Sequence, residues 1–425
     1  MARQLVRDAP SLTRRAAPLA TALGLLYAAQ GVPFGIAAEY LPVVLRKAHY
    51  GYAHIAALFW LQLPWQLKVV WATAADHPRL RARTRSVILA LQLTLAVAVA
   101  TYAVAPFERA PVMWFVVTAV CALIASSQDV FVDAFAVRVL GEDERGFGNV
   151  AQVAGYRVGM LAGGAGLLLL VGSLGERTTL LAVAAFIALA SVGAFHSGAS
   201  AARAEATPHA ELAPPSTRTA KQRVLGLLSH LGAPAPRRVL AVAIAFKLGL
   251  HMAGSLIKPM TVDAGWSTRQ IGAAVVTAGT VAGLVGAGAG GAVHRYLGEP
   301  RALRVAVVLQ ALACAPLAFV ARAHAPLTAT TAAIAAEHFA SGLGTTVLFA
   351  ALISATRPRD AGLHYTILTS ANALGIGLGG LAGGLVADRL GLVTAFALAT
   401  AVAALPMFLL SDWRQTAERS RHEAV

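Results

Sequence analysis

Charged side chains are scarce in this sequence. Asp, Glu, Lys and Arg make up 13% of the 425 residues, whereas soluble domains carry about 25%. Hydrophobic residues make up 57%, and the mean hydropathy is +0.65. They occur in blocks of about 20 residues or more, the length that crosses a hydrocarbon core of roughly 30 Å. Together these features exclude an ordinary soluble fold and predict a multi-pass helical membrane protein.

Cysteine is also rare, and catalytic motifs are missing. Cys121 and Cys314 lie in separate apolar blocks, which indicates neither a disulfide framework nor a metal site. We recognise no Ser-His-Asp arrangement, metal cluster or nucleotide signature. The glycine-rich tracts Gly283–Gly291 and Gly375–Gly384 follow no strand and precede no Lys-Ser or Lys-Thr pair, so they favour small-residue helix faces over phosphate loops. We predict no enzyme activity, no cofactor and no metal.

Twelve apolar spans follow one another along the chain. They are Ala16–Leu45, Tyr52–Ala75, Ser86–Ala105, Val112–Leu140, Phe147–Val171, Thr178–Phe195, Val239–Thr261, Gln270–Tyr296, Ala302–Ala321, Leu327–Ala355, Leu363–Ala387 and Leu392–Leu410. A proline-rich segment separates the sixth span from the seventh. We therefore predict an all-α membrane protein with 12 transmembrane helices in two pseudo-symmetric six-helix bundles. The N-terminal bundle covers residues 1–198, a cytoplasmic linker 199–236, and the C-terminal bundle with a short tail 237–425.

An internal repeat supports two related halves. When the sequence is shifted by 216 positions, Gly159 falls on Gly375 and Gly163 falls on Gly379. Both matches lie at the same point of a six-span unit. Paired halves of this kind are expected of a carrier whose site lies between two bundles.

Loop charges predict the orientation. Basic residues gather in alternate loops, and the largest groups are Arg79, Arg81, Arg83 and Arg85, then Arg203, Arg218, Lys221, Arg223, Arg237 and Arg238, and then Arg295, Arg301 and Arg304. The positive-inside rule places both termini and the linker in the cytoplasm. The expected location is the inner membrane of the cell. Arg46 and Lys47, after the first span, are the exception. Because the net charge of +15 is spread over short loops, it does not indicate a nucleic-acid partner.

Two carboxylates in the fourth span are candidates for proton exchange. Asp129 and Asp133 are four residues apart, so both project from one helix face. Two carboxylates that repel each other favour the uptake of a proton by one of them. Arg157 in the fifth span is a candidate to neutralise one. The alternative is a structural charge cluster at the cytoplasmic helix ends.

Other ionisable residues inside spans are costly and therefore notable. Lys247 and His251 share a helix face and, with Lys258 two turns further, indicate a cationic wall for an anionic solute. The alternative is snorkelling to the interface, above all by Lys258 near the outer end of the span. Glu337 and His338 form either a second proton site or a satisfied internal pair. Lys68 in the second span has no partner nearby in sequence, and Glu39 is one candidate counter-ion.

Several motifs resemble one branch of a known family. The segment 27–35 (YAAQGVPFG) resembles the first-helix signature of the muropeptide-permease and acetyl-CoA-transporter branch of the major facilitator superfamily. Leu63–Lys68 with Trp71 and Asp76 resembles its second helix, and Ser126–Asp129 with Asp133 its fourth. The branch includes siderophore permeases, which segments 258–267 and 361–374 resemble more closely. The loop motif of the superfamily is degenerate here, since His77 and Pro78 follow Asp76.

The resemblance implies a secondary active transporter that takes up a medium-sized polar or anionic solute, a muropeptide or a siderophore, by proton-coupled alternating access. The alternative is an efflux carrier for amphiphilic compounds. The expected partners are the solute, protons and the lipid bilayer, and the expected state is a monomer. The expected solute and proton pathway comprises Gln30, Phe34, Glu39, Lys68, Gln128, Asp129, Asp133, Tyr156, Arg157, Lys247, His251, Glu337, His338 and Asn372. Asp76, Arg145 and Arg295 are the expected gating-loop residues.

Overall fold

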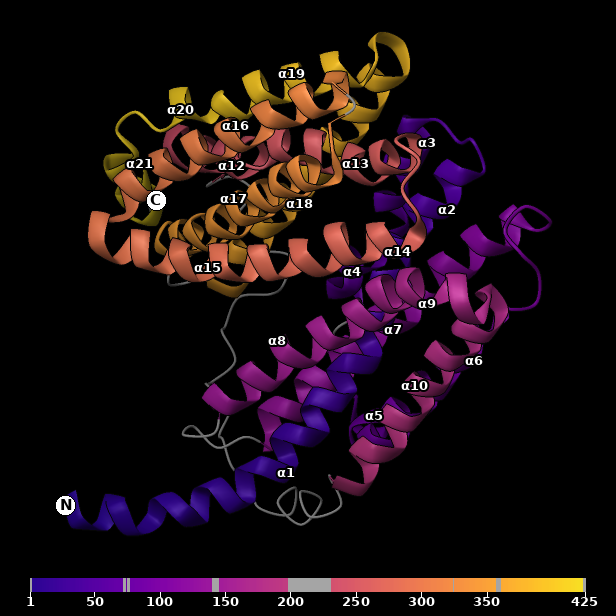
Figure 1. Ribbon diagram of the computed structural model, residues 1–425. Coiled ribbons are helices and arrows are strands. Elements are labelled where there is room, and N and C mark those ends of the chain that lie inside the picture. The colour runs from indigo at the N-terminus through magenta and orange to yellow at the C-terminus, as the bar shows by residue number, and fades with distance from the viewer. Residues whose placement is uncertain are drawn as a thin grey trace. The chain divides into compact units, whose positions relative to one another are not determined.

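The regular structure of the protein is helical wherever the structure describes it (Figure 1). The computed structural model describes residues 2–71, 74, 77–139, 145–197, 231–323, 325–356 and 361–422. Within those ranges, 11 helical stretches are long and apolar enough to cross a membrane. They match every predicted span except the second. The multi-span helical fold is thus confirmed, and the count of 12 stays a prediction.

The helices of the N-terminal half include two π-helical turns and two 3-10 segments. In chain order they are α1 (Ala2–Gly35), η1 (Ile36–Tyr40), α2 (Leu41–Lys47), α3 (Tyr52–Ala57), η2 (Leu58–Gln62), α4 (Leu63–Leu67), η3 (Lys68–Val70), α5 (Pro78–Arg81), α6 (Thr84–Thr101), α7 (Pro111–Val139), α8 (Arg145–Leu161), η6 (Ala162–Gly166), α9 (Leu167–Leu174) and α10 (Glu176–Ser197).

The C-terminal half has one further π-helical segment. Its elements are α12 (Pro234–Ala245), α13 (Leu248–Asp263), α14 (Thr268–Ile271), η8 (Gly272–Thr277), α15 (Ala278–Leu297), α16 (Glu299–Ala323), α17 (Leu327–Ser354), α18 (Ala361–Leu390), α19 (Leu392–Ala404), α20 (Pro406–Leu409) and α21 (Trp413–His422).

The second predicted span is divided into short pieces. Between Tyr52 and Val70 the chain passes through α3, the 3-10 segment η2, α4 and the 3-10 segment η3. Pro64 lies in the first turn of α4. Proline lacks the N–H of a regular helix and its ring collides with the preceding turn, so the first turn of a helix is where it costs least. The break places Lys68 at the start of η3 instead of in a continuous helix.

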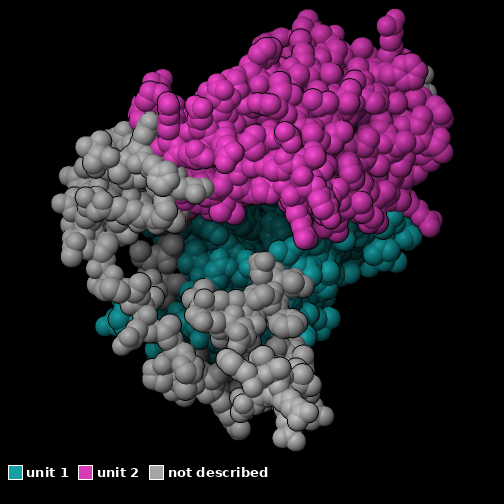
Figure 2. Space-filling view, turned by 90° about the vertical axis from the view of Figure 1, so that its left-hand side faces the viewer, with its two compact units in different colours: residues 1–44, 59–214 teal, residues 45–58, 215–425 magenta. Residues whose placement is uncertain are grey.

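Contacts divide the chain into two compact units, coloured separately in Figure 2. The N-terminal unit comprises residues 1–44 and 59–214, and the C-terminal unit comprises residues 45–58 and 215–425. The segment Leu45–Leu58, here called the connector, follows the first span but belongs to the C-terminal unit. Residues 198–230, which include most of the predicted linker, lie outside the described part of the chain. The predicted domain boundaries therefore stay a prediction.

Glycines allow α1 and α8 to pack backbone against backbone in the N-terminal unit (Figure 1). A Cβ atom on Gly159 would lie 1.9 Å from the carbonyl oxygen of Ala28, and one on Gly163 would lie 2.2 Å from that of Val32. No side chain fits at those distances. The two helices consequently approach as closely as small residues permit, which is the usual way helices associate in membranes.

The same packing recurs 216 positions later in the C-terminal unit. A Cβ atom on Gly375 would lie 1.9 Å from the carbonyl oxygen of Ile244, and one on Gly379 would lie 2.2 Å from that of Leu248. Each of these four residues is the sequence-shifted counterpart of one in the α1–α8 contact. The offset therefore relates equivalent helix contacts, and the glycine tract beginning at Gly375 is a packing face as predicted.

The surface of the described helices is apolar. Large hydrophobic side chains stand exposed along several of the spans, among them Val97 at 69%, Leu189 at 71% and Phe319 at 69%. Lipid tails solvate such side chains, so their exposure fits helices that face a bilayer. A few ionisable groups, among them Asp129, Lys247 and Glu337, are buried between helices, where the candidate site lies.

Candidate functional site

The first polar cluster joins α1, η3 and α7 in the N-terminal unit. Asp129 on α7 is 7% exposed. Gln30 donates its side-chain amide to one carboxylate oxygen of Asp129, and Lys68 donates its ammonium to the other. Lys68 Nζ also lies 3.9 Å from Asp133 Oδ2. The two carboxylates that the sequence placed on one helix face thus share a single lysine.

Tyr27 completes this cluster, although the motif analysis gave it no role. Its hydroxyl donates to Asp133 Oδ1 at 2.5 Å. Tyr27 and Gln30 are three residues apart on α1, and Asp129 and Asp133 are four apart on α7, so two helix faces meet in register. The signal that could have found Tyr27 is its position one turn before Gln30. We call Tyr27, Gln30, Lys68, Asp129 and Asp133 the aspartate cluster.

The aspartate cluster is unevenly enclosed. The side chain of Asp129 is 10% exposed and that of Asp133 is 43% exposed. Two carboxylates against one ammonium leave one negative charge in excess. Asp133 is both the more open group and the one farther from Lys68. Chemically, the cluster can bind one further cation, of which a proton is the smallest.

Arg157 does not take the place predicted for it. Its side chain is exposed on α8, and among the described side chains no ion pair joins it to Asp129 or Asp133. Lys68 is the cation that neutralises them. The position of Lys68 beside α7 follows from the break in the second span, which the sequence did not reveal.

The remaining predicted residues of this unit have other surroundings, and Glu39 is not the ion-pair partner of Lys68 that the sequence suggested. The Phe34 ring packs on Tyr156, with centroids 6.0 Å apart, and on Trp65 at 6.4 Å. Gln128 is fully buried and donates to the backbone oxygen of Leu26 at 3.2 Å, which is a structural bond between α7 and α1. Glu39 lies in the π-helical turn η1.

The second cluster lies at the junction of α12 and α13 in the C-terminal unit. Lys247 is 2% exposed. Its Nζ donates to the backbone oxygen of Ser341 at 2.8 Å and to the Ser341 hydroxyl at 3.0 Å. An ammonium has three hydrogens to donate. Among the described residues, no carboxylate lies within ion-pair distance of Lys247, so this charge is held by neutral oxygen atoms from α17.

Glu337 and His338 form an internal pair beside Lys247. His338 Nδ1 lies 2.9 Å from Glu337 Oε2 and 3.0 Å from the backbone oxygen of Ile334. Both neighbours of Nδ1 accept hydrogen bonds, which assigns the hydrogen to Nδ1. The titratable neighbours of His251, which lies one turn after Lys247, are Lys247, Glu337, His338 and Lys258. We call Lys247, His251, Glu337, His338 and Ser341 the lysine–histidine cluster.

The predicted gating residues are only partly described. Asp76 and the side chain of Arg145 lie outside the described residues. Arg295 stacks near the ring of Tyr296, with 6.0 Å to its centroid. Asn372 on α18 is 4% exposed, and its side-chain oxygen has no hydrogen-bond partner in the part of the chain that the structure describes.

Glu299 is the polar residue of this region that the sequence analysis missed. It accepts from Trp413 Nε1 at 2.7 Å and from the hydroxyl of Ser354 at 2.5 Å. Its bonds join the start of α16 to the end of α17 and the start of α21. Their role is structural.

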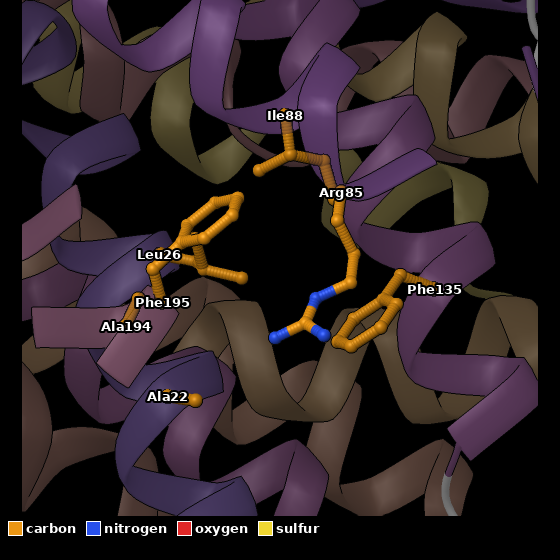
Figure 3. A pocket seen from close by; sticks show the side chains of 7 residues that line it. All are labelled: Ala22, Leu26, Arg85, Ile88, Phe135, Ala194 and Phe195. Carbon is orange, nitrogen blue, oxygen red and sulfur yellow. The ribbon is translucent and has the colours of Figure 1, made fainter. Parts of the chain in front are cut away.

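A pocket of the N-terminal unit lies apart from the aspartate cluster (Figure 3). Its lining residues come from α1, α6, α7 and α10, and are Ala22, Leu26, Arg85, Ile88, Phe135, Ala194 and Phe195. The Arg85 guanidinium lies 5.5 Å from the Phe195 ring centroid. The other lining side chains are apolar, so this pocket is unsuited to a polar solute.

A polytopic helical fold with two related halves, each with an ionisable cluster between its helices, defines a membrane carrier. The comparisons with known proteins make this specific. The model of the Major Facilitator Superfamily matches residues 19–336 and 239–424. The chain belongs to this superfamily of transporters and is a multi-pass membrane protein.

The curated relatives include a permease and a putative transporter. The chain is 26% identical over 410 residues to the anhydromuropeptide permease of Escherichia coli (strain K12), a match that covers 95% of this chain and 81% of that protein. It is also 26% identical over 365 residues to the putative transporter AmpG 4 of Rickettsia felis, which covers 81% of this chain and 84% of the relative. The resemblance to the muropeptide-permease branch is confirmed.

Solved structures share the fold. A bacterial homolog of the human lysosomal transporter Spinster, in an inward-facing and unoccupied conformation, superposes with a TM-score of 0.71. The match covers 97% of this chain and 99% of that one at 12% identity. At this identity the likeness supports the fold alone.

Proposed function

We propose that this protein is a proton-coupled permease that takes up an anhydromuropeptide by alternating access across the inner membrane. The observation that supports this choice of solute is the match to an anhydromuropeptide permease along 95% of the chain. Of the two solutes that the sequence left open, the relatives favour the muropeptide. Loop charges support cytoplasmic termini.

The aspartate cluster is the proposed proton site. Its single ammonium neutralises one carboxylate, and the other is free to take a proton from the side to which it is exposed. Proton binding at Asp133 or Asp129 would release Lys68 from one partner, which changes how η3 is held against α7. Proton binding is then coupled to a movement of the second span, which is broken at η3.

The lysine–histidine cluster is the proposed anchor for an acidic group of the solute. Lys247 carries a buried charge, and its hydrogen-bond partners among the described residues are two neutral oxygens of Ser341. A peptide carboxylate supplies the missing counter-charge, and charge-assisted bonds are about twice as strong as neutral ones. Glu337 and His338 limit this attraction, since the glutamate repels an anion.

Proton coupling is tested by uptake into proteoliposomes. An imposed inward proton gradient is expected to drive accumulation of an anhydromuropeptide above its external concentration. Asp129→Asn is expected to abolish accumulation, and Ser127→Ala, a change on the same helix outside the cluster, is the control. Undiminished, gradient-independent flux in Asp129→Asn would refute the coupling.

The solute anchor is tested with a pair of solutes. Lys247→Gln is expected to weaken uptake of the free peptide acid by about tenfold, on the order of one charge-assisted bond, and to leave uptake of the carboxamide form nearly unchanged. Arg414→Gln removes a positive charge from an exposed helix and serves as the control. Equal losses for acid and amide would refute the anchor.

A further inference from the structure

The pocket of the N-terminal unit has a buried, apolar floor and a partly exposed mouth (Figure 3). The floor consists of side chains that are at most 5% exposed, namely Ala22, Leu26, Ile88, Phe135 and Ala194. The two remaining lining residues, Arg85 and Phe195, are partly exposed and form the mouth. A buried water molecule needs about two to four polar partners, and the side chains of this floor offer none. The floor therefore suits a hydrocarbon chain better than water.

The mouth lies at one end of four helices that pack on one another, α1, α6, α7 and α10. Arg85 is the second residue of α6, Phe135 lies four residues before the end of α7, and Phe195 lies two residues before the end of α10. The basic loop 79–85 leads into α6 at this end, and the loop charges predict that it is cytoplasmic. The mouth is therefore expected at the level of the lipid headgroups on the cytoplasmic side.

The guanidinium of Arg85 is not neutralised by the protein around it. Among the described residues, its side chain makes no ion pair and no hydrogen bond. It lies instead against the ring of Phe195, with 5.5 Å to the centroid, and Figure 3 shows it extending from α6 between the other lining side chains. A guanidinium has five N–H donors in a planar fork that matches a phosphate group. The mouth thus holds donors suited to a phosphate.

Further positive charge lies around the mouth. The side chains of Arg79, Arg81 and Arg83 are exposed on the loop before Arg85, and Arg138 on α7 donates to the hydroxyl of Thr84 at 2.9 Å. Basic groups beside a membrane attract anionic lipids. A hydrocarbon chain gains little when it leaves lipid tails for an apolar pocket, because both surroundings are equally apolar. The charge of the headgroup therefore decides which lipid this pocket prefers.

From these observations we propose that the pocket binds an anionic phospholipid of the cytoplasmic leaflet, with one acyl chain in the floor and the headgroup phosphate on Arg85. The bound lipid joins α6 to α1, α7 and α10 at one end of the unit. Leu26 in the floor is also the residue whose backbone oxygen accepts from Gln128 at 3.2 Å and from Gln92 at 3.4 Å, so the chain ends beside the bonds that join these helices. The site lies apart from both ionisable clusters and does not depend on the proposed solute.

The experiment measures lipid binding to the full chain by native mass spectrometry. The protein in nonionic detergent micelles is titrated with phosphatidylglycerol or with phosphatidylcholine of the same acyl chains. The parent is expected to bind one phosphatidylglycerol about tenfold more tightly than phosphatidylcholine, on the order of one charge-assisted bond. Lysophosphatidylglycerol, which keeps one chain, should also bind. Glycerophosphoglycerol, which has the same headgroup and no chain, should not bind.

Variants at the mouth separate the charge from the apolar wall. Arg85→Gln should weaken phosphatidylglycerol binding about tenfold, to the level of phosphatidylcholine, whereas Arg85→Lys keeps the charge and should keep most of the preference. Phe195→Ser removes apolar surface from the mouth and should weaken lysophosphatidylglycerol binding. Arg83→Gln is the matched control, because Arg83 is exposed on the same loop and does not line the pocket. All of these side chains are partly or fully exposed, so the variants are expected to fold.

The lipid site is overturned if Arg83→Gln weakens phosphatidylglycerol binding as much as Arg85→Gln does, since the diffuse charge of the loop would then explain the preference. It is also overturned if glycerophosphoglycerol binds as tightly as lysophosphatidylglycerol, which would indicate a site for a free phosphate ester. Unchanged binding of lysophosphatidylglycerol in Phe195→Ser would place the acyl chain elsewhere and overturn the site as well.

Discussion

Lys68 is the residue whose removal best tests the charge balance of the aspartate cluster. Lys68→Met keeps most of the side-chain volume and removes the ammonium. Asp129 and Asp133 then face each other on α7 with no cation between them. Two opposite charges 4 Å apart attract by about 1–4 kcal/mol between the dielectric limits of water and a protein surface. Because the Lys68 side chain is 36% exposed, we expect Lys68→Met to lower the free energy of unfolding by an amount near the lower end of this range, about 1–2 kcal/mol.

Asp129→Asn should lower the free energy of unfolding by less than Lys68→Met does. The Gln30 amide can still donate to the asparagine oxygen, and Lys68 keeps Asp133 as its ion-pair partner. Combining the two substitutions removes both members of the closest pair. The loss in the double variant should therefore be smaller than the sum of the single losses by about 1 kcal/mol, the coupling expected of contacting groups.

The protein contains its own unfolding reporter for this measurement. Cys121 is 1% exposed on α7 of the N-terminal unit, and Cys314 is fully buried on α16 of the C-terminal unit. With Cys314 replaced by alanine, a thiol-reactive dye reports the thermal unfolding of the N-terminal unit alone. A loss of 1–2 kcal/mol should lower the midpoint by about 3–6 °C in a unit of this size.

Arg157→Met is the control, because the sequence predicted Arg157 as the neutralising cation and the structure leaves it exposed. Its midpoint should stay within about 1 °C of the parent, as for other surface changes. The reasoning is refuted if Arg157→Met destabilises more than Lys68→Met. It is equally refuted if the losses of Lys68→Met and Asp129→Asn are strictly additive.

Further outcomes follow from the helix contacts. Gly159→Ala should destabilise the N-terminal unit by about 1–2 kcal/mol, since overpacking outweighs the gain in helix propensity. Gly166→Ala should not destabilise the unit, because its Cβ would meet its nearest neighbour at 3.5 Å. The reaction of the dye with Cys121 during thermal unfolding measures both effects. Gly375→Ala, in the equivalent contact of the other half, should lower the midpoint of the C-terminal unit by a similar amount, and an unequal response would contradict the equivalence. Ser267→Ala removes a capping box and should cost about 1 kcal/mol, measured in the same way.

Sequence patterns were sufficient for much of the fold. The length and apolarity of the blocks determine the spans, because an unpaired backbone in lipid is too costly for anything except helices and closed barrels. The 216-residue offset also identified residues that are equivalent in space, since Gly159 and Gly375 make the same contact with Ala28 and Ile244. Small residues at fixed spacing determine helix contacts directly, so this inference needed no tertiary information.

The partners of charged residues were decided only by tertiary structure. The spacing of Asp129 and Asp133 fixed their common face, but their cation came from a segment 61 residues away in sequence from Asp129. Arg157 was nearer in sequence and lies elsewhere. Ion pairs depend on which helix faces meet and where a span breaks, and neither is encoded in the local pattern.

The connector illustrates the same division most clearly. The sequence by itself marked Arg46 as a charge on the wrong side, because loop charge is a local property that a topology rule can read. Its neutralisation required Asp263, 217 positions further along the chain. The sequence alone determined that this protein spans the membrane as two related halves. Only the folded chain decided which charges meet, because long-range pairing is set by the packing of whole helices.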